Sequence, residues 1–404
     1  MIDSADVNTF DESGRRVSTG GEQHTGQARI AHRLAGAYRD RLLFVHGIGW
    51  HRWDGTRWAV DLDETHAYRA VLDVVRSALA ESVGDKQLRA DATRCESDAG
   101  VSGVLAIARR LVEFAATVDD VDADPALLNT ATGTLDLRTM TLREHDPADR
   151  LTKVTAAGYR RHADPQEWAG FLERVLPDPD ERAYLQRVVG QALYGRVGAQ
   201  LFPVLTGTGA NGKSTATGAL TATLGDYAAV IDPALLVNDR GRPPGPETMQ
   251  LLGARLVIAS ETSEGSRLDE ATMKRLTGGD PITARHLYRE PVTWTPSHQL
   301  LYVTNRLPAV KGNDPAVWRR IRVIPFNVVI PASERDPELS ERLTLHADAI
   351  LSWAVAGWQD YRAGGMREPA SVLTATEEYQ ADSVGRIVLL RVPSAQLSSR
   401  TIVA

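Results

Sequence analysis

The chain has 404 residues, of which 43% are hydrophobic, so it can bury a large core and is long enough for two or three domains. Its formal net charge of −6 argues against a protein that coats nucleic acid over its whole surface, and its single cysteine, Cys95, excludes a disulfide framework within one chain. No run approaches the roughly 18 apolar residues of a membrane span, and the polar N-terminus does not look like a signal peptide. We therefore expect a soluble, cytoplasmic protein with no membrane partner.

The N-terminal third is predicted to be an α+β domain behind a disordered arm. Residues 1–27 are polar and rich in glycine without periodicity, which is typical of a disordered segment. A helical pattern from residue 28 runs into an apolar strand, and the dipeptide Asp54-Gly55 predicts a tight hairpin turn. Three tryptophans surround that turn: Trp50, Trp53 and Trp58. They could stack on nucleobases, but the usual burial of tryptophan favours the core of a small sheet.

The stretch that follows is predicted to be mainly structural. Residues 64–117 have the periodicity of two amphipathic helices separated by a polar connection at residues 84–100. The acidic run at residues 119–124 lacks flanking apolar strands, which favours a solvated loop over the carboxylate cluster of a metal-dependent polymerase. A hairpin is expected around Gly133, and two helices are expected within residues 166–198.

The most specific motif follows an apolar strand at residues 201–206. Gly207, Gly212, Lys213 and Ser214 fit G-x-x-x-x-G-K-[ST], and a helical pattern begins directly after the last glycine. Because strand and helix lie where the motif requires them, a phosphate loop (P-loop) is favoured over an ordinary glycine-rich turn. The predicted nucleotide contacts are Gly207, Thr208, Gly209, Ala210, Asn211, Gly212, Lys213, Ser214 and Thr215.

Two later apolar strands each end in a polar side chain. Glu261 ends the strand at residues 255–261, where a carboxylate beside a phosphate loop can hold the Mg²⁺ shell or polarise the attacking water. Ser260 stands where an aspartate usually precedes such a glutamate, so metal binding is expected to depend on Ser214 with Glu261 nearby. Asn305 ends the second strand and, as both donor and acceptor, can orient a water against the γ-phosphate.

Positive charge is concentrated between Arg267 and Phe326. This stretch has ten Lys/Arg and five Asp/Glu, which gives +5, and the rest of the chain then totals −11. Any contact with a polyanion is expected to lie in this stretch. Two strands in this stretch turn near Tyr288, and the turn also carries Arg285, His286 and Arg289, which suits phosphate contact beside a stacking ring; the alternative is a solvated hairpin face.

In this order the segments GTGANGKST, VIASE, LTGGDPITARHLY, LLYVTN and DPAVWRRIRVIPF resemble a superfamily 3 helicase of the phage/plasmid primase-helicase type, related to poxvirus nucleoside triphosphatases. The resemblance implies an α/β, AAA+-like P-loop ATPase core that assembles as a hexameric ring. It also implies an ATP-driven DNA helicase in phage or prophage replication, fuelled by Mg²⁺-ATP and acting on single-stranded DNA. A separate primase or other replication protein is a further possible partner, and the cytoplasm of a bacterial host is the implied location.

The resemblance also implies roles for individual residues. Those inside the nucleotide site are the P-loop pair Lys213 and Ser214, the Walker B acid Glu261 and the sensor Asn305. Arg320 matches the arginine finger that reaches a neighbouring subunit's γ-phosphate, with the adjacent Arg319 as its rival. The DNA-binding set is Lys274, Arg285, His286, Tyr288 and Arg289.

The expected domain order is an arm (1–27), an α+β domain (28–165), a helical linker or collar (166–198), the ATPase domain (199–330) and a helical C-terminal segment (331–404). No zinc module or polymerase carboxylate set is evident, so priming activity is not expected, and the last residues are expected to be an atypical, truncated tail. Two alternatives remain: an AAA+ ATPase that acts on protein, whose hydrolysis DNA does not stimulate, and an ATP-binding subunit without helicase activity.

Overall fold

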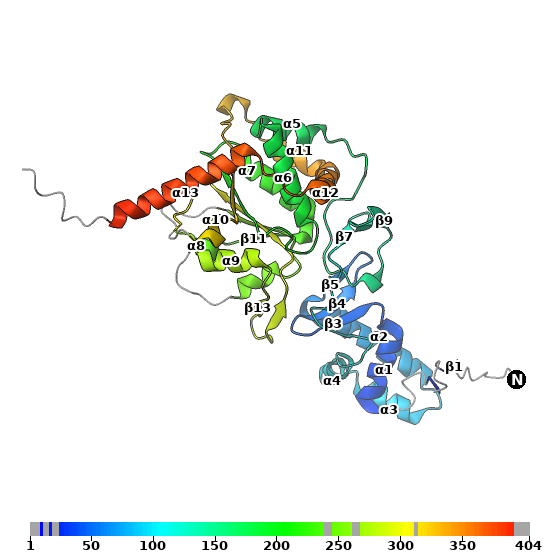
Figure 1. Cartoon of the computed structure of the whole chain (residues 1–404). Coiled ribbons are helices and arrows are strands. Elements are labelled where there is room, and N and C mark those ends of the chain that lie inside the picture. The colour runs from blue at the N-terminus through cyan, green and yellow to red at the C-terminus, as the bar shows by residue number, and fades with distance from the viewer. Residues whose placement is uncertain are drawn as a thin grey trace, which may run out of the picture. The chain divides into compact units, whose positions relative to one another are not determined.

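The computed structural model of the chain (Figure 1) describes residues 9–10, 16–17, 24–237, 245–260, 267–310 and 314–391, with side chains described from residue 24 to 383 within these ranges. The chain divides into two compact units. The first unit comprises residues 1–123, 145–153 and 286–292, and the second comprises 124–144, 154–285 and 293–404. The first unit therefore ends at residue 123 and takes in two later segments, whereas the expected N-terminal domain ended at residue 165. Leu128 and Leu135 share one hydrophobic core with Trp168, which ties residues 124–144 to the second unit.

The first unit packs helices beside a small mixed sheet. Its helices are α1 (Gly26–Tyr38), α2 (Thr65–Glu81), α3 (Lys86–Arg94) and α4 (Asp98–Ala108). The sheet has the order β5-β4-β3-β6, with β3 (Leu42–Val45), β4 (Gly49–Trp53), β5 (Trp58–Val60) and β6 (Ala115–Ala116). Within the arm expected to be disordered, the structure describes one short antiparallel pair, β1 (Thr9–Phe10) and β2 (Arg16–Val17).

The hairpin at Asp54-Gly55 is confirmed, and so is the core position of Trp50 and Trp58, whereas Trp53 is only partly buried. The turn joins β4 to β5, and Trp50 and Trp58 are only 2% and 3% exposed. Burial of this kind leaves little ring surface on which a nucleobase could stack.

The polar connection predicted at residues 84–100 was wrong, because it contains helix α3. The Asp85 side chain accepts a hydrogen bond from Leu88 N at 2.9 Å, which caps the helix, and Leu88 and Ala92 are buried. The helix is short and mostly polar, so its apolar stripe is too sparse to give a clear periodic signal.

The acidic run is confirmed as a loop. The Asp120 carboxylate accepts bonds from the Thr117 amide and hydroxyl at 2.7 Å, and the Asp122 carboxylate accepts one from Thr152 N at 2.9 Å. Asp120 thus satisfies the backbone of its own turn, as Asp side chains commonly do in loops, whereas Asp122 joins the loop to the segment at Thr152.

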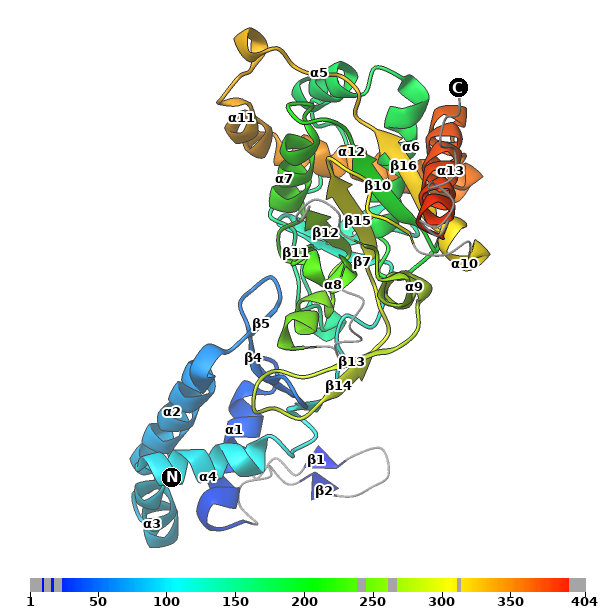
Figure 2. The same ribbon diagram turned by 90° about the vertical axis from the view of Figure 1, so that its left-hand side faces the viewer.

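The second unit is a mixed α/β structure built on a parallel five-stranded sheet with the order β11-β12-β15-β10-β16 (Figure 2). The strands are β10 (Phe202–Thr206), β11 (Ala228–Ile231), β12 (Leu256–Ser260), β15 (Gln299–Thr304) and β16 (Ile321–Pro325). Every residue of β15 is buried, as expected for a parallel strand covered on both faces.

The second unit also contains helices and a small three-stranded sheet, and a separate two-stranded pair includes Val292 of the first unit. The longer helices are α5 (Gln166–Val175), α6 (Pro179–Ala192), α7 (Lys213–Leu224), α9 (Glu270–Gly278), α12 (Ala347–Gly364) and α13 (Ala370–Arg391). Shorter helices are α8 (Ala234–Val237), α10 (Pro315–Trp318) and α11 (Leu339–Leu345). The small sheets are β7 (Leu127–Thr130), β8 (Gly133–Asp136) and β9 (Thr141–Arg143), and the pair β13 (Ile282–Ala284) and β14 (Val292–Trp294).

Two glycines allow α6 and α12 to pack closely. A Cβ atom at Gly190 would lie 2.2 Å from Trp358 N, and one at Gly357 would lie 2.1 Å from Gln186 O. At the sheet edge, α13 lies along β16, where the Thr376 hydroxyl accepts a hydrogen bond from Val323 N at 3.0 Å. None of the helices that the structure describes is long and apolar enough to cross a membrane.

His51 makes the stability of the first unit dependent on pH. Its ring is 3% exposed on β4, with Nδ1 3.0 Å from Gly49 O, and burial lowers its pKa to about 4. The unfolded chain therefore binds the proton more tightly. Stability from this group is present above pH 6.5 and is lost as the pH falls toward 4, by roughly 2 kcal/mol between pH 7 and pH 5.

The variant His51→Asn keeps a donor for Gly49 O and removes the titrating ring. Urea unfolding from pH 7 to pH 5 should show a shallower fall in the free energy of unfolding than in the native chain. Equal slopes in the two proteins would show that another group dominates the acid sensitivity.

Candidate functional site

The glycine-rich loop, residues 207–212, leads from the C-terminal end of β10 into α7. Its backbone has positive φ at Gly207 (151°), Gly209 (96°), Ala210 (49°) and Gly212 (84°). A backbone that curls in this way turns successive N–H groups toward one point, which suits an anion at a helix N-terminus.

Two of these glycines are also required by close packing. A Cβ atom at Gly207 would lie 2.2 Å from Phe326 O, and one at Gly212 would lie 2.5 Å from Val175 Cγ1. The loop is therefore held against the end of β16 on one side and against α5 on the other. The residues present fit a phosphate site, because the backbone amides of the loop can face a ligand while Phe326 and Val175 hold the loop in place.

Lys213, the first residue of α7, has its ammonium group fixed above the loop. Nζ donates to Gly207 O at 2.7 Å, to Asn211 Oδ1 at 3.1 Å and to Asn305 Oδ1 at 3.1 Å, and the residue is only 4% exposed. Asn211 is itself anchored, since its Nδ2 donates to Phe326 O at 3.0 Å. These three acceptors fix the position of the ammonium group at the start of α7.

Strand register explains why Asn305 reaches Lys213. β10 and β15 are parallel neighbours in which Thr206 pairs with Thr304, so the glycine-rich loop and Asn305 leave the sheet at the same edge. The structure therefore brings together two of the predicted site residues, Lys213 and Asn305. Glu261 follows β12 in the sequence, but it lies outside the described residues, so its predicted role stays a prediction.

Arg319 and Arg320 precede the first residue of β16, so they lie at the end of the sheet opposite to the glycine-rich loop. Arg320 is 6% exposed, and its guanidinium donates to Ala316 O at 2.6 Å and to Gln200 Oε1 at 2.8 Å. Arg319 is exposed and lies 3.4 Å from the same Gln200 oxygen. Burial and the neighbouring Arg319 charge lower the pKa of Arg320. Two guanidinium groups therefore share one neutral acceptor, and the Asp280 and Asp314 carboxylates act electrostatically on Arg320.

The basic turn joins β13 to β14. Arg285, His286, Tyr288 and Arg289 are all exposed, and Tyr288 is fully so, with a positive φ of 61°. The structure thus places four of the five predicted DNA-binding residues on one exposed turn. Lys274 differs, because it lies on α9 and its ammonium pairs with Asp314 at 2.9 Å, which makes it a weaker candidate for phosphate contact.

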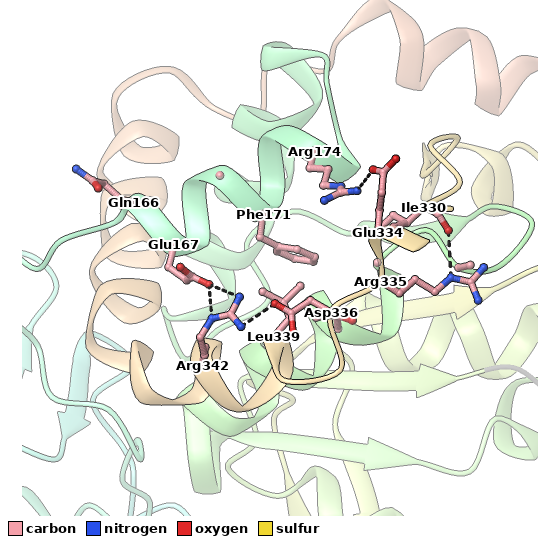
Figure 3. A pocket seen from close by; sticks show the side chains of 14 residues that line it. Gln166, Glu167, Phe171, Arg174, Ile330, Glu334, Arg335, Asp336, Leu339 and Arg342 are labelled. Atoms are coloured by element: carbon pink, nitrogen blue, oxygen red, sulfur yellow. Dashed lines mark hydrogen bonds and ion pairs between the residues drawn. The ribbon is translucent and has the colours of Figure 1, made fainter. Parts of the chain in front are cut away.

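Sequence reasoning missed a pocket beside the glycine-rich loop (Figure 3). Its volume is about 470 Å³, and it lies among α5, the start of α7, residues 330–336 and α11. The bracing roles of Asn211 and Gln200 were also missed. No spacing in the sequence marks these contacts, because the partners lie more than 100 positions away.

Two families match different parts of the chain. Residues 31–177 match the family described as "D5 N terminal like", and residues 205–320 match a family of unknown function, DUF5906.

Several curated proteins of large DNA viruses are similar in sequence. "Putative helicase L207/L206" of Acanthamoeba polyphaga mimivirus is 31% identical over 284 residues, covering 65% of this chain and 30% of that protein. "Putative helicase 022R" of Frog virus 3 is 27% identical over 299 residues, covering 68% and 28%. "Putative primase C962R" of African swine fever virus (isolate Tick/Malawi/Lil 20-1/1983) is 23% identical over 235 residues, covering 56% and 24%. The chain thus spans less than a third of the length of these relatives.

Among solved structures, the apo structure of the NrS-1 C terminal region (305-718) is 13% identical, with a TM-score of 0.40, covering 53% of this chain and 54% of that one. The resemblance seen in the motifs is thus confirmed: residues 31–177 match a D5 N terminal-like family, residues 205–320 match DUF5906, and similar viral proteins are named as putative helicases and primases.

Proposed function

We propose that the chain is an AAA+-like P-loop ATPase that acts as a superfamily 3 DNA helicase in the replication of a phage, prophage or similar element. The observation that carries this proposal is the contact between Lys213 Nζ and Asn305 Oδ1 at 3.1 Å, above a loop whose backbone suits phosphate. The relatives named as helicases and primases support a role in DNA replication.

In this proposal the nucleotide is ATP with Mg²⁺, which supplies the phosphoanhydride bond and the charge neutralisation for its cleavage. The N–H groups of the glycine-rich loop and the Lys213 ammonium hold the β- and γ-phosphates. The Ser214 hydroxyl and Glu261 hold the metal shell, and Glu261 also polarises the attacking water. Asn305 orients that water, and its bond to Lys213 fixes the amide for this task.

The arginine finger is proposed to act between subunits of a hexameric ring. Arg320 precedes β16, whereas the glycine-rich loop follows β10, and these strands are parallel, with Phe202 paired to Ile321. The five residues of β16 separate Arg320 from the end of the sheet that carries the glycine-rich loop, a distance of about 16 Å at the usual rise of a strand. In this proposal the arginine therefore does not serve the nucleotide of its own chain.

The exposed turn between β13 and β14 is proposed to contact single-stranded DNA. Two guanidinium groups and a histidine suit phosphate oxygens, and the exposed Tyr288 ring suits stacking on a base. An ATPase acting on protein would not need this combination.

Removing the Lys213 ammonium tests the proposed site. Lys213→Ala should lower ATP turnover by about 10² to 10³, since a preorganised charge on the transferring phosphoryl group is lost. Lys86→Ala is the matched control, because it removes an exposed ammonium on α3. Turnover is measured with and without single-stranded DNA, which should stimulate the native protein. Native-like turnover in folded Lys213→Ala would refute the site, and absence of DNA stimulation would favour the protein-acting alternative.

Replacing Arg285, His286 and Arg289 with alanine tests the turn. Single-stranded DNA binding should weaken, and the slope of log affinity against log salt should flatten by about 0.7 for each lost phosphate contact. Replacing the exposed Lys86 and Arg89 on α3 removes similar charge elsewhere and should leave the slope unchanged. An unchanged slope in the turn variant would identify a solvated hairpin face.

Mixing inactive subunits tests the finger. Lys213→Ala and Arg320→Ala should each be inactive alone, since a finger is worth about 10³ to 10⁵ in rate. In an equal mixture that assembles at random, about a quarter of the interfaces join an intact loop to an intact Arg320, so part of the ATPase activity should return. Repeating the experiment with Arg319→Ala in place of Arg320→Ala shows which of the two arginines acts as the finger. Mixed rings without recovered activity would show that Arg320 is structural or acts within its own chain.

A further inference from the structure

Gln200 lies in the connection from α6 to β10, beside the arginines at the N-terminal end of the sheet. β10 and β16 are neighbours, and Phe202 N donates to Arg320 O at 2.6 Å, so residues 200 and 320 lie on adjacent segments. The Gln200 side chain uses both ends of its amide. Oε1 accepts a hydrogen bond from Arg320 Nη2 at 2.8 Å, and Nε2 donates to the carbonyl of Gly278, the last residue of α9, at 3.0 Å. A single amide therefore joins the Arg320 guanidinium to the end of α9.

The Arg320 guanidinium depends on this contact for its orientation. The residue is 6% exposed, and Nη1 donates to Ala316 O at 2.6 Å, an acceptor four positions earlier in the same segment. Nε is buried and has no hydrogen-bond partner among the residues that the structure describes. Gln200 thus supplies the contact from outside the segment. Without it, Nη2 of a nearly buried cation would lose its acceptor, and the group would reorient to regain one.

The acceptor is a neutral amide oxygen, which has a consequence for the charge that it holds. Arg319 Nη2 lies 3.4 Å from the same Oε1, so this oxygen faces two guanidinium groups. A carboxylate at residue 200 could bind a guanidinium through two charge-assisted bonds and hold it in an ion pair. An amide orients the group through a weaker bond, which suits a cation that must approach a phosphate.

Helix α9 supports Arg320 by a second route. The Asp314 carboxylate caps α10, where it accepts from Ala316 N at 2.8 Å, and it also accepts from Lys274 Nζ of α9 at 2.9 Å. Ala316 O is the other acceptor of the Arg320 guanidinium. Both acceptors are therefore tied to α9, one at Gly278 and one at Lys274. Lys274, which the sequence predicted to bind DNA, belongs to this support.

We propose that Gln200 is a positioning residue for Arg320, whose guanidinium it holds in the orientation that the nucleotide of a neighbouring subunit requires. This rests on the proposed finger. Gln200 precedes β10 and the glycine-rich loop follows it, so the five residues of the strand separate the amide from the nucleotide of its own chain. Loss of the amide should therefore slow ATP cleavage and leave ATP affinity unchanged.

Gln200→Met tests this proposal in the full chain, because methionine is also long and unbranched but lacks the amide. The kcat for ATP should fall by about tenfold to a hundredfold, the cost of a displaced catalytic group, while the Kd for Mg²⁺-ATP should change by less than about twofold. Gln87→Met on α3 is the matched control and should change neither value. Gln87 is also exposed, and its Nε2 donates to Asp91 at 3.0 Å, so this variant loses a side-chain hydrogen bond too.

Two further measurements exclude a merely structural role. Gln200→Met should lower kcat no further in the Arg320→Ala background, because the amide acts through that guanidinium. Mixed with Lys213→Ala subunits, Gln200→Met subunits should give more ATPase activity than the mean of the two proteins alone. The reason is that some interfaces then join an intact loop to an Arg320 that is still held by Gln200.

The outcomes separate this proposal from the finger itself. If Arg320→Ala slows turnover but Gln200→Met does not, the finger stands and the positioning role is overturned. A loss of ATP affinity as large as the loss of kcat, or additive losses in the double variant, would show that Gln200 is structural and would also overturn the proposal. Native-like turnover in folded Arg320→Ala would refute the finger, and the role of Gln200 with it.

Discussion

The parallel pairing of β10 with β15 is the constraint on which the site depends. Because Thr206 and Thr304 are in register, the glycine-rich loop and Asn305 leave the sheet side by side, although they are almost 100 residues apart in the sequence. A nearly buried ammonium group needs acceptors, and Lys213 finds them on both strand ends. The neighbouring pairing with β16 brings Phe326 O under the loop, where it accepts a hydrogen bond from Asn211.

The polarity of the same sheet separates the two groups of cations. All five strands are parallel, so their C-terminal ends lie along one end of the sheet and their N-terminal ends lie along the other. Lys213 lies at the first end, and Arg319 and Arg320 lie at the second. A single chain cannot bring them to one phosphate without breaking the sheet, which is the physical reason for proposing that neighbouring subunits share the nucleotide site.

Glycines set how closely the second unit can pack around its loop. Gly207 and Gly212 combine a positive φ with contacts that leave no room for a Cβ atom, whereas Gly209 has a positive φ and open space around it. The motif therefore contains two kinds of requirement. Conformation alone explains Gly209, but tertiary packing against Phe326 and Val175 adds a second reason for the other two.

The sequence by itself determined the strand, loop and helix around Lys213, because the motif has fixed residue spacing and these elements follow one another in the chain. It also identified Asn305, since an apolar strand that ends in a polar side chain can be recognised locally. It missed α3, whose capping Asp85 was a better signal than its sparse apolar stripe.

Only the tertiary structure decided the surroundings of these residues. It paired Lys274 with Asp314, buried Arg320 against Gln200 while leaving Arg319 exposed, and enclosed a pocket between Phe171 and Leu339. Each of these facts joins side chains that are 40 to about 170 residues apart. Such contacts depend on how the sheet and helices pack, and periodicity reports only the face that a residue occupies on its own element.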